Sequence, residues 1–158
     1  MKFDIVTRLQ REAQTLSPLQ NNASQTLPLV FCGDFNLKPT SFPYKCLTSG
    51  KHKLDYSSPH LQEHKKSVIS GWQMPDLEPM TSLYAAVHGA EPAYTNNCLQ
   101  LFTHGQNEFC DTLDYIFGNA RVAAKGAPLL PSEKKGPLLP DQHNPSDHLP
   151  VVVDVEIS

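Results

Sequence analysis

The sequence lacks several features that would identify a function directly. None of its 4 cysteines belongs to a C-x-x-C pair, which excludes a zinc ribbon and a thioredoxin-like redox motif. It has no run of 18 apolar residues, and the N-terminal segment MKFDIVTRLQ lacks the apolar stretch of a secretory signal. We therefore expect a cytoplasmic protein with no membrane partner, and a nuclear or mitochondrial location stays open.

The chain also lacks an excess of positive charge. Its formal net charge is -3, so any polyanionic partner must be held by a local patch or through a cation. The 14 prolines outnumber the 8 glycines, which indicates long, stiff loops rather than a helical bundle. A length of 158 residues with 39% hydrophobic residues suffices for one domain with a core.

The most informative stretch is LPLVFCGDFN, residues 27–36. Its run of apolar residues predicts a strand buried on both faces, which Gly33 ends by allowing an unusual φ. Asp34 and Asn36 then bring a carboxylate and an amide to the loop that leaves the strand. Taken alone, these residues are equally typical of an ordinary Asx turn.

Periodicity and capping signals predict the remaining elements. A 3.6-residue period predicts an amphipathic helix over residues 2–16, and Ser41 or Thr40, Pro43 and Gly50 delimit a short second helix. Residues 51–80 lose all periodicity and predict an exposed loop insertion. The other expected elements are a helix over 79–89, a strand around Tyr94, a loop or wide hairpin between 96 and 111, and strands over 113–117 and 121–124. The valines at 151–153 predict one more strand, which we expect to be buried like the first.

Three further polar residues lie within or beside predicted strands. Asp114 is embedded in the apolar alternation of LDYIF and needs a partner, while Asp147 and His148 directly precede the valines near the C-terminus. Since the ends of neighbouring strands can meet at one rim, these residues can join Asp34 and Asn36 around one phosphate. Singly each is more often structural, but together they predict a site.

Such a set of residues has the groups that phosphodiester hydrolysis needs. Asp34 would be the base, Asn36 would donate to the phosphate, and Asp147 would bind a hard cation through oxygen. His148 would contact the scissile phosphate, and Asp114 would fix its tautomer and favour its cationic form.

The motifs GDFN at 33–36, LDYIF at 113–117 and PSDHLPV at 145–151 resemble, in this order, the last three motifs of the endonuclease/exonuclease/phosphatase superfamily. The similar branch is that of the carbon-catabolite-repressor-type deadenylases, which includes Angel proteins, nocturnin and the mitochondrial 2′,5′-phosphodiesterase, and EPAYTN at 91–96 resembles the last of these. The resemblance implies a DNase-I-like α/β fold, a four-layer α/β/β/α sandwich, of which residues 1–158 would supply the C-terminal sheet and its helices.

The same resemblance implies roles for individual residues. Asp34, Asn36, Asp114 and His148 match catalytic positions, Asn36 and His148 also match phosphate-binding positions, and Asp34, Asn36 and Asp147 match the metal site for Mg²⁺, with Mn²⁺ as an alternative. Family members begin with a half that carries the principal metal-binding glutamate, and Glu12, Glu63 and Glu78 do not replace it. We expect that half to pack on this chain.

The sequence thus predicts a metal-dependent 3′–5′ exoribonuclease acting on poly(A) RNA or 2′,5′-oligoadenylate. Two alternatives remain. The first is a phosphatase of a small nucleotide phosphate or of a cyclic-phosphate RNA end. The second is a catalytically inactive binding module, which the missing glutamate favours.

Overall fold

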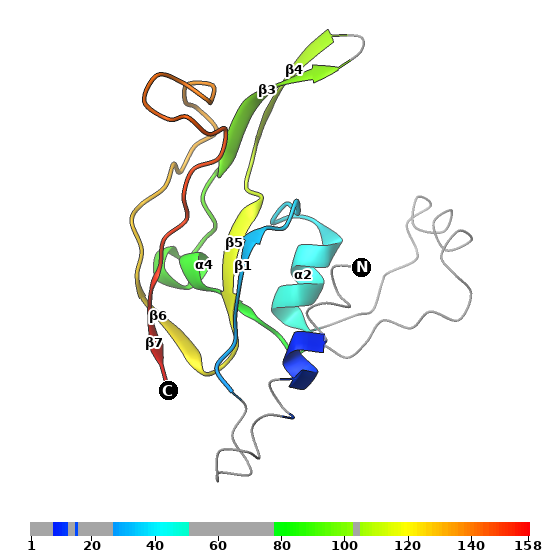
Figure 1. Ribbon diagram of the computed structural model, residues 1–158, viewed down its shortest axis with the longest axis vertical. Coiled ribbons are helices and arrows are strands. Elements are labelled where there is room, and N and C mark those ends of the chain that lie inside the picture. The colour runs from blue at the N-terminus through cyan, green and yellow to red at the C-terminus, as the bar shows by residue number, and fades with distance from the viewer. Residues whose placement is uncertain (1–7, 13–14, 16–26, 51–77, 103–104) are drawn as a thin grey trace, which may run out of the picture.

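The computed structural model describes residues 8–12, 15, 27–50, 78–102 and 105–158. Their strands form three antiparallel sheets, ordered β1-β5-β2, β3-β4 and β6-β7 (Figure 1). The elements are β1 Val30–Asp34, α2 Phe42–Ser49, β2 Thr81–Ser82, α4 Leu83–His88, β3 Asn96–Phe102, β4 Gly105–Asp111, β5 Asp114–Gly118, β6 Val122–Gly126 and β7 Asp154–Ile157. This is the mixed α/β class that the sequence predicts. In the described part of the chain, no helix has the length and apolar character needed to cross a bilayer.

The core lies between the β1–β5 sheet and α2. The predicted alternation in β5 is confirmed, because Tyr115 and Phe117 are almost fully buried whereas the intervening Ile116 is only half-buried. The buried members of this cluster are Phe35, Leu47, Met80, Tyr115 and Phe117. The Tyr115 hydroxyl also donates to the Leu37 carbonyl at 2.7 Å, so the core fixes the loop that follows β1.

The short helix α2 confirms its predicted boundaries. Ser41 is its N-cap and accepts from the Tyr44 backbone N–H, and Pro43 lies in the first turn. Gly50 ends the helix in the left-handed conformation, with φ 64°.

Two apolar runs are less buried than predicted, and these predictions were wrong. Val30 is 42% exposed and Val152 is 52% exposed, and β7 begins only at Asp154, after the valines. The physical reason is position, because β1 and β7 are edge strands and only Phe31 of β1 packs against the core. Val30 and Val152 therefore keep much of their surface in contact with solvent.

The remaining elements are of the predicted type, but their boundaries differ from the predicted ones. The expected 79–89 helix starts only at Leu83, because Thr81 and Ser82 pair with β5, and it ends at Gly89 as predicted. Of the two options for 96–111, the wide hairpin is present, because β3 and β4 pair with each other. The strand expected at 121–124 is β6, Val122–Gly126, and the strand expected around Tyr94 begins only at Asn96.

The two remaining predicted segments are described only in part. Residues 8–12 and 15 are helical, and the rest of the 2–16 helix lies outside the described residues. Within residues 8–12 and 15, the buried side chain is that of Gln10. Its amide nitrogen donates to the Glu78 carbonyl, and its amide oxygen accepts from the Glu78 N–H. Residues 51–77 of the insertion also lie outside, but its last residue, Met80, is a core residue.

Candidate functional site

Asp34, the last residue of β1, is exposed at the surface. Gly33 has φ 144°, so the unusual backbone conformation expected there is present. The backbone N–H of Asn36 donates to Asp34 Oδ1 at 2.7 Å, which is the Asx turn, and Asn36 itself has φ 49°. Phe35 between them is buried in the core. The turn therefore orients the carboxylate, and it does so through the Asn36 backbone rather than through its side-chain amide.

Asp114 lies directly opposite Asp34 in the pairing of β1 with β5. Directly opposite residues in an antiparallel pair project from the same face of the sheet. The two carboxylates that the sequence placed on separate strands are therefore neighbours at one end of this sheet.

His148 completes the arrangement from the C-terminal segment. Its Nδ1 lies 2.8 Å from Asp114 Oδ2, the contact that the sequence predicts for the embedded aspartate. The backbone of His148 pairs with that of Asn96 in an antiparallel bridge, and the Leu149 N–H donates to the Thr95 carbonyl at 2.7 Å. These contacts hold His148 in place. With Nδ1 engaged, Nε2 is the ring nitrogen left for a substrate.

The pKa of His148 is raised above its ordinary value. Partial burial alone would lower the pKa, but the hydrogen bond and charge of Asp114, together with the charges of Asp147 and Asp34, outweigh it. Three carboxylates from three segments thus act on one imidazole and favour its cationic form.

Thr95 is a site residue that the sequence reasoning missed. It is fully buried, and its hydroxyl donates to Asp114 Oδ2 at 2.6 Å while accepting from the backbone N–H groups of Leu113 and Asp114. Asp114 Oδ2 therefore accepts from both Thr95 and His148. The available signal was the pair TN at the end of EPAYTN, which was noted only as a resemblance.

Asn96, the second residue of that pair, positions Asp147. Its side-chain amide donates to Asp147 Oδ2 at 3.2 Å, and the Asn97 N–H donates to the Asp147 carbonyl at 3.3 Å. Asp147, the residue before His148, is therefore fixed both through its backbone and through its carboxylate, which accepts from the side-chain amide of the buried Asn96.

The donor set suits a hard cation only in part. Asp34 and Asp147 supply carboxylate oxygens and Asn36 an amide oxygen, which are the ligand types that Mg²⁺ prefers. Among the described residues, however, no group of three or more His, Cys, Asp or Glu side chains is placed to hold a metal ion. The predicted metal residues match the chemistry of the ion without forming a complete site.

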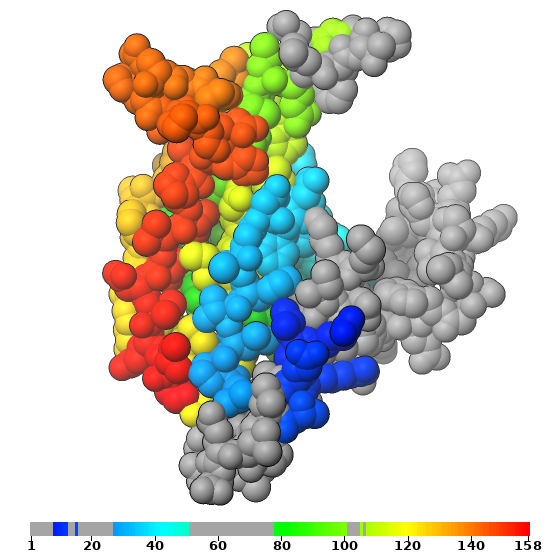
Figure 2. Space-filling model, in the orientation of Figure 1, coloured from blue at the N-terminus to red at the C-terminus, as the bar shows by residue number. Residues whose placement is uncertain are grey.

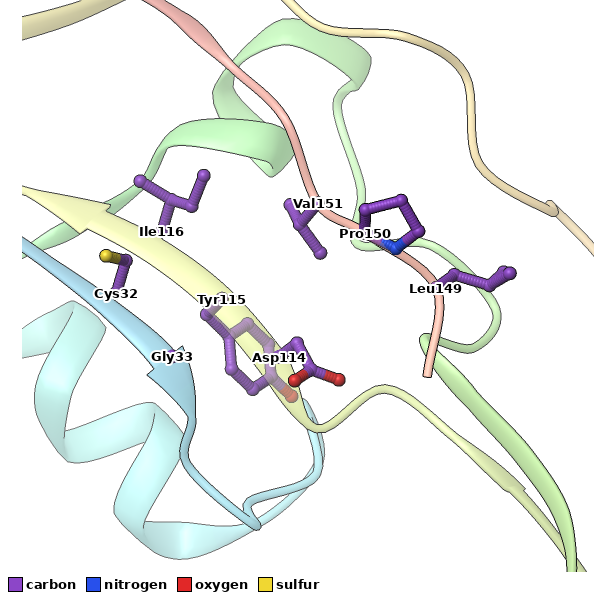
Figure 3. Close-up of a pocket in the computed structure, with 8 residues that line it drawn as sticks. All are labelled: Cys32, Gly33, Asp114, Tyr115, Ile116, Leu149, Pro150 and Val151. Atoms are coloured by element: carbon purple, nitrogen blue, oxygen red, sulfur yellow. The ribbon is translucent and has the colours of Figure 1, made fainter. Parts of the chain in front are cut away.

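A pocket of about 270 Å³ opens beside Asp114, between the sheet and the C-terminal segment (Figure 3). Its walls are mostly apolar, and Asp114 is the one acidic residue among those that line it. It is lined by Cys32, Gly33, Asp114, Tyr115, Ile116, Leu149, Pro150 and Val151. Asp114 therefore lines an apolar pocket and also contacts His148 through its carboxylate.

One protein family and several known proteins are similar to this chain in sequence. The model of the Endonuclease/Exonuclease/phosphatase family matches residues 4–148. Carbon catabolite repressor protein 4 homolog 4 of Arabidopsis thaliana is 32% identical over 154 residues, which cover 94% of this chain and 32% of that protein. Nocturnin of Xenopus laevis is 32% identical over 151 residues, 93% of this chain and 32% of its own length.

A third relative is the CCR4-Not complex 3'-5'-exoribonuclease subunit Ccr4 of Aspergillus clavatus. It is 28% identical over 158 residues, which cover 92% of this chain and 22% of the subunit. The chain thus spans a third or less of the length of these relatives. All three fall in the branch that the sequence motifs resemble.

Proposed function

Because the chain belongs to the endonuclease/exonuclease/phosphatase family, we propose that it carries catalytic residues of a divalent-metal-dependent phosphodiester hydrolase acting on RNA. The observation that carries the proposal is the 2.8 Å contact between His148 Nδ1 and Asp114 Oδ2, next to Asp34. The Aspergillus clavatus relative is named as a 3'-5'-exoribonuclease subunit, which supports RNA as the substrate.

The residues divide the chemistry as follows. Asp34, oriented by its Asx turn, accepts the proton of the attacking water. The cationic His148 donates from Nε2 to a non-bridging phosphate oxygen, and Asp114 stabilises that cation. The amide of Asn36 donates to the same phosphate.

Mg²⁺, or Mn²⁺ in its place, would be held by Asp34, Asn36 and Asp147 together with a glutamate from outside this chain. When bound, the ion neutralises charge on the phosphate oxygens. The incomplete set of ligands among the described residues supports the view that a second segment completes the site.

The first test measures AMP released from oligoadenylate with 3′,5′ or 2′,5′ linkages. The protein is this chain fused behind the upstream part of the Arabidopsis relative, which supplies the expected glutamate. We expect magnesium-dependent AMP release and a loss of turnover of about 10²-fold or more in Asp34→Asn, with folding unchanged. Near-normal kcat in Asp34→Asn would show that the base is misassigned.

The same assay separates the alternatives. Release of inorganic phosphate without AMP would identify a phosphatase of small nucleotides or of RNA ends. The incomplete metal site among the described residues favours a silent binding module for the chain alone. Calorimetric titration with magnesium tests this, since a half-site that cannot bind the ion gives no heat of specific binding.

A further inference from the structure

Two lysines from different segments share one carboxylate close to the site. Lys38 Nζ lies 2.9 Å from Asp111 Oδ2, and Lys134 Nζ lies 3.2 Å from the same oxygen. Lys38 follows the Asx turn, Asp111 ends β4, and Lys134 lies in the loop after β6 that runs alongside the β3–β4 hairpin (Figure 1). We call this group the lysine pair.

The lysine pair carries more charge than Asp111 cancels. Burial alone would raise the pKa of Asp111, but hydrogen bonds from both lysines hold it below its usual range, so the carboxylate is ionised at neutral pH. Two positive charges then face one negative charge. Each ammonium has three donors, and both lysine side chains are about half exposed, at 51% and 52%, so donors remain for an anion in solvent.

The position of each ammonium is constrained. Lys38 Nζ also lies 5.2 Å from the centroid of the Phe109 ring, a cation–π distance, so it is held from two sides. Lys134 reaches the same oxygen from a segment that is itself tied to the hairpin through the Leu139 N–H and the Asn97 carbonyl at 2.7 Å. An anion would therefore meet two cations that are already in place.

The lysine pair lies two strands from the imidazole. Asn96 pairs with Asp111 on one side and with His148 on the other. Since neighbouring strands lie about 5 Å apart, the backbones of Asp111 and His148 are about 10 Å apart. Both half-exposed ammonium groups contact Asp111 Oδ2, so they lie on the side of Asn96 opposite to His148.

From this geometry we propose that Lys38 and Lys134 bind the backbone phosphates of the RNA strand next to the phosphate at His148. The inference rests on the proposed function and extends it, because a chain of net charge -3 can hold a polyanion only through a bound cation or through a local patch such as this one. A substrate with a single phosphate at His148 would leave the lysine pair unused.

The test measures binding of a fluorescent oligoadenylate of about eight nucleotides to this chain by anisotropy, without magnesium, over a range of potassium chloride concentrations. We expect Lys38→Gln and Lys134→Gln each to weaken binding and to reduce the slope of log K against log salt by about 0.7, and the double variant by about 1.4. The matched control is Lys125→Gln, which removes the same charge from β6, where Lys125 pairs with Glu156. Its slope should equal that of the unaltered chain.

Equal slopes in all variants would overturn the inference and leave the proposed function standing, because that function is decided by AMP release and by Asp34→Asn. Equally effective displacement of the oligoadenylate by polyglutamate would also overturn it, since the patch would then fit an acidic peptide. Circular dichroism of the variants checks that replacing these half-exposed side chains leaves the fold intact.

Discussion

The imidazole of His148 is the side chain whose environment most directly determines the chemistry. Its Nδ1 contacts a carboxylate that Thr95 also holds, so the ring cannot rotate without losing a hydrogen bond. The charges around it raise its pKa. A titration of this one residue therefore reports on the whole arrangement.

We predict that Asp114→Asn lowers the pKa of His148 towards the ordinary value of about 6.5, because the asparagine keeps the shape but loses the charge. NMR titration of the His148 ring protons measures this directly. Asp154→Asn, which removes an exposed carboxylate from β7, is the matched control and should leave the His148 pKa unchanged.

The raised pKa also makes stability depend on pH. A group whose pKa is higher in the folded state stabilises the fold fully below its unfolded pKa of about 6.5, and this stability is lost as the pH rises through the folded pKa. The decline should be smaller in Asp114→Asn. An unchanged His148 pKa in that variant would contradict the assigned contact.

The residues of this site were predictable to different degrees. A carboxylate inside an apolar strand requires a partner, so Asp114 and His148 could be paired from sequence alone. Thr95 could not, because a buried threonine beside a strand is ordinary and only the fold shows that its hydroxyl meets Asp114. The role of the Asn36 backbone was likewise invisible, since side-chain type says nothing of which atom makes the Asx turn.

At the level of elements, α2 packs against the chain directly after Asp34, where β1 ends. Its residues Tyr44 and Leu47 pack with Phe35, the residue between Asp34 and Asn36. The helix ends at Gly50, whose N–H donates to the Cys46 carbonyl at 2.9 Å in the left-handed conformation. The left-handed cap at Gly50 thus ends a helix that contributes Leu47 to the same core cluster as Phe35.

We predict that Gly50→Ala destabilises the fold by about 1 kcal/mol, because an alanine pays the steric cost of the left-handed region. Gly50→Asn is the matched control, since asparagine tolerates that conformation, and it should cost less. Urea unfolding followed by circular dichroism gives both values. Identical midpoints for the two variants would show that the left-handed cap contributes nothing.

The elements themselves were predictable where local signals act. Ser41, Pro43 and Gly50 fix α2 through capping, and the alternation in β5 marks its buried face. The apolar runs of β1 and of 151–153 did not predict burial correctly. A hydrophobic sequence favours burial of a strand, but it does not show which neighbouring element would cover that strand. Edge position is a property of the sheet rather than of the strand.

The whole molecule leaves much of that apolar surface open. Large side chains on β1 and on the C-terminal segment remain exposed, namely Val30 at 42%, Val152 at 52%, Val155 at 41% and Ile157 at 60%. These two segments lie close together, since Cys32 and Val151 line one pocket (Figure 3), and both reach the face shown in Figure 2. Large exposed apolar side chains on neighbouring segments favour association.

We predict that the chain by itself associates in a concentration-dependent manner, because covering this surface removes it from water. Sedimentation velocity at several concentrations measures the association. Ile157→Lys, at the most exposed of these positions, should weaken it, whereas Ala123→Lys, at an exposed position of β6 without a large apolar side chain, should not. A compact monomer at every concentration would mean that the open face is stable in water, and the expectation that another layer packs on this sheet would lose its physical basis.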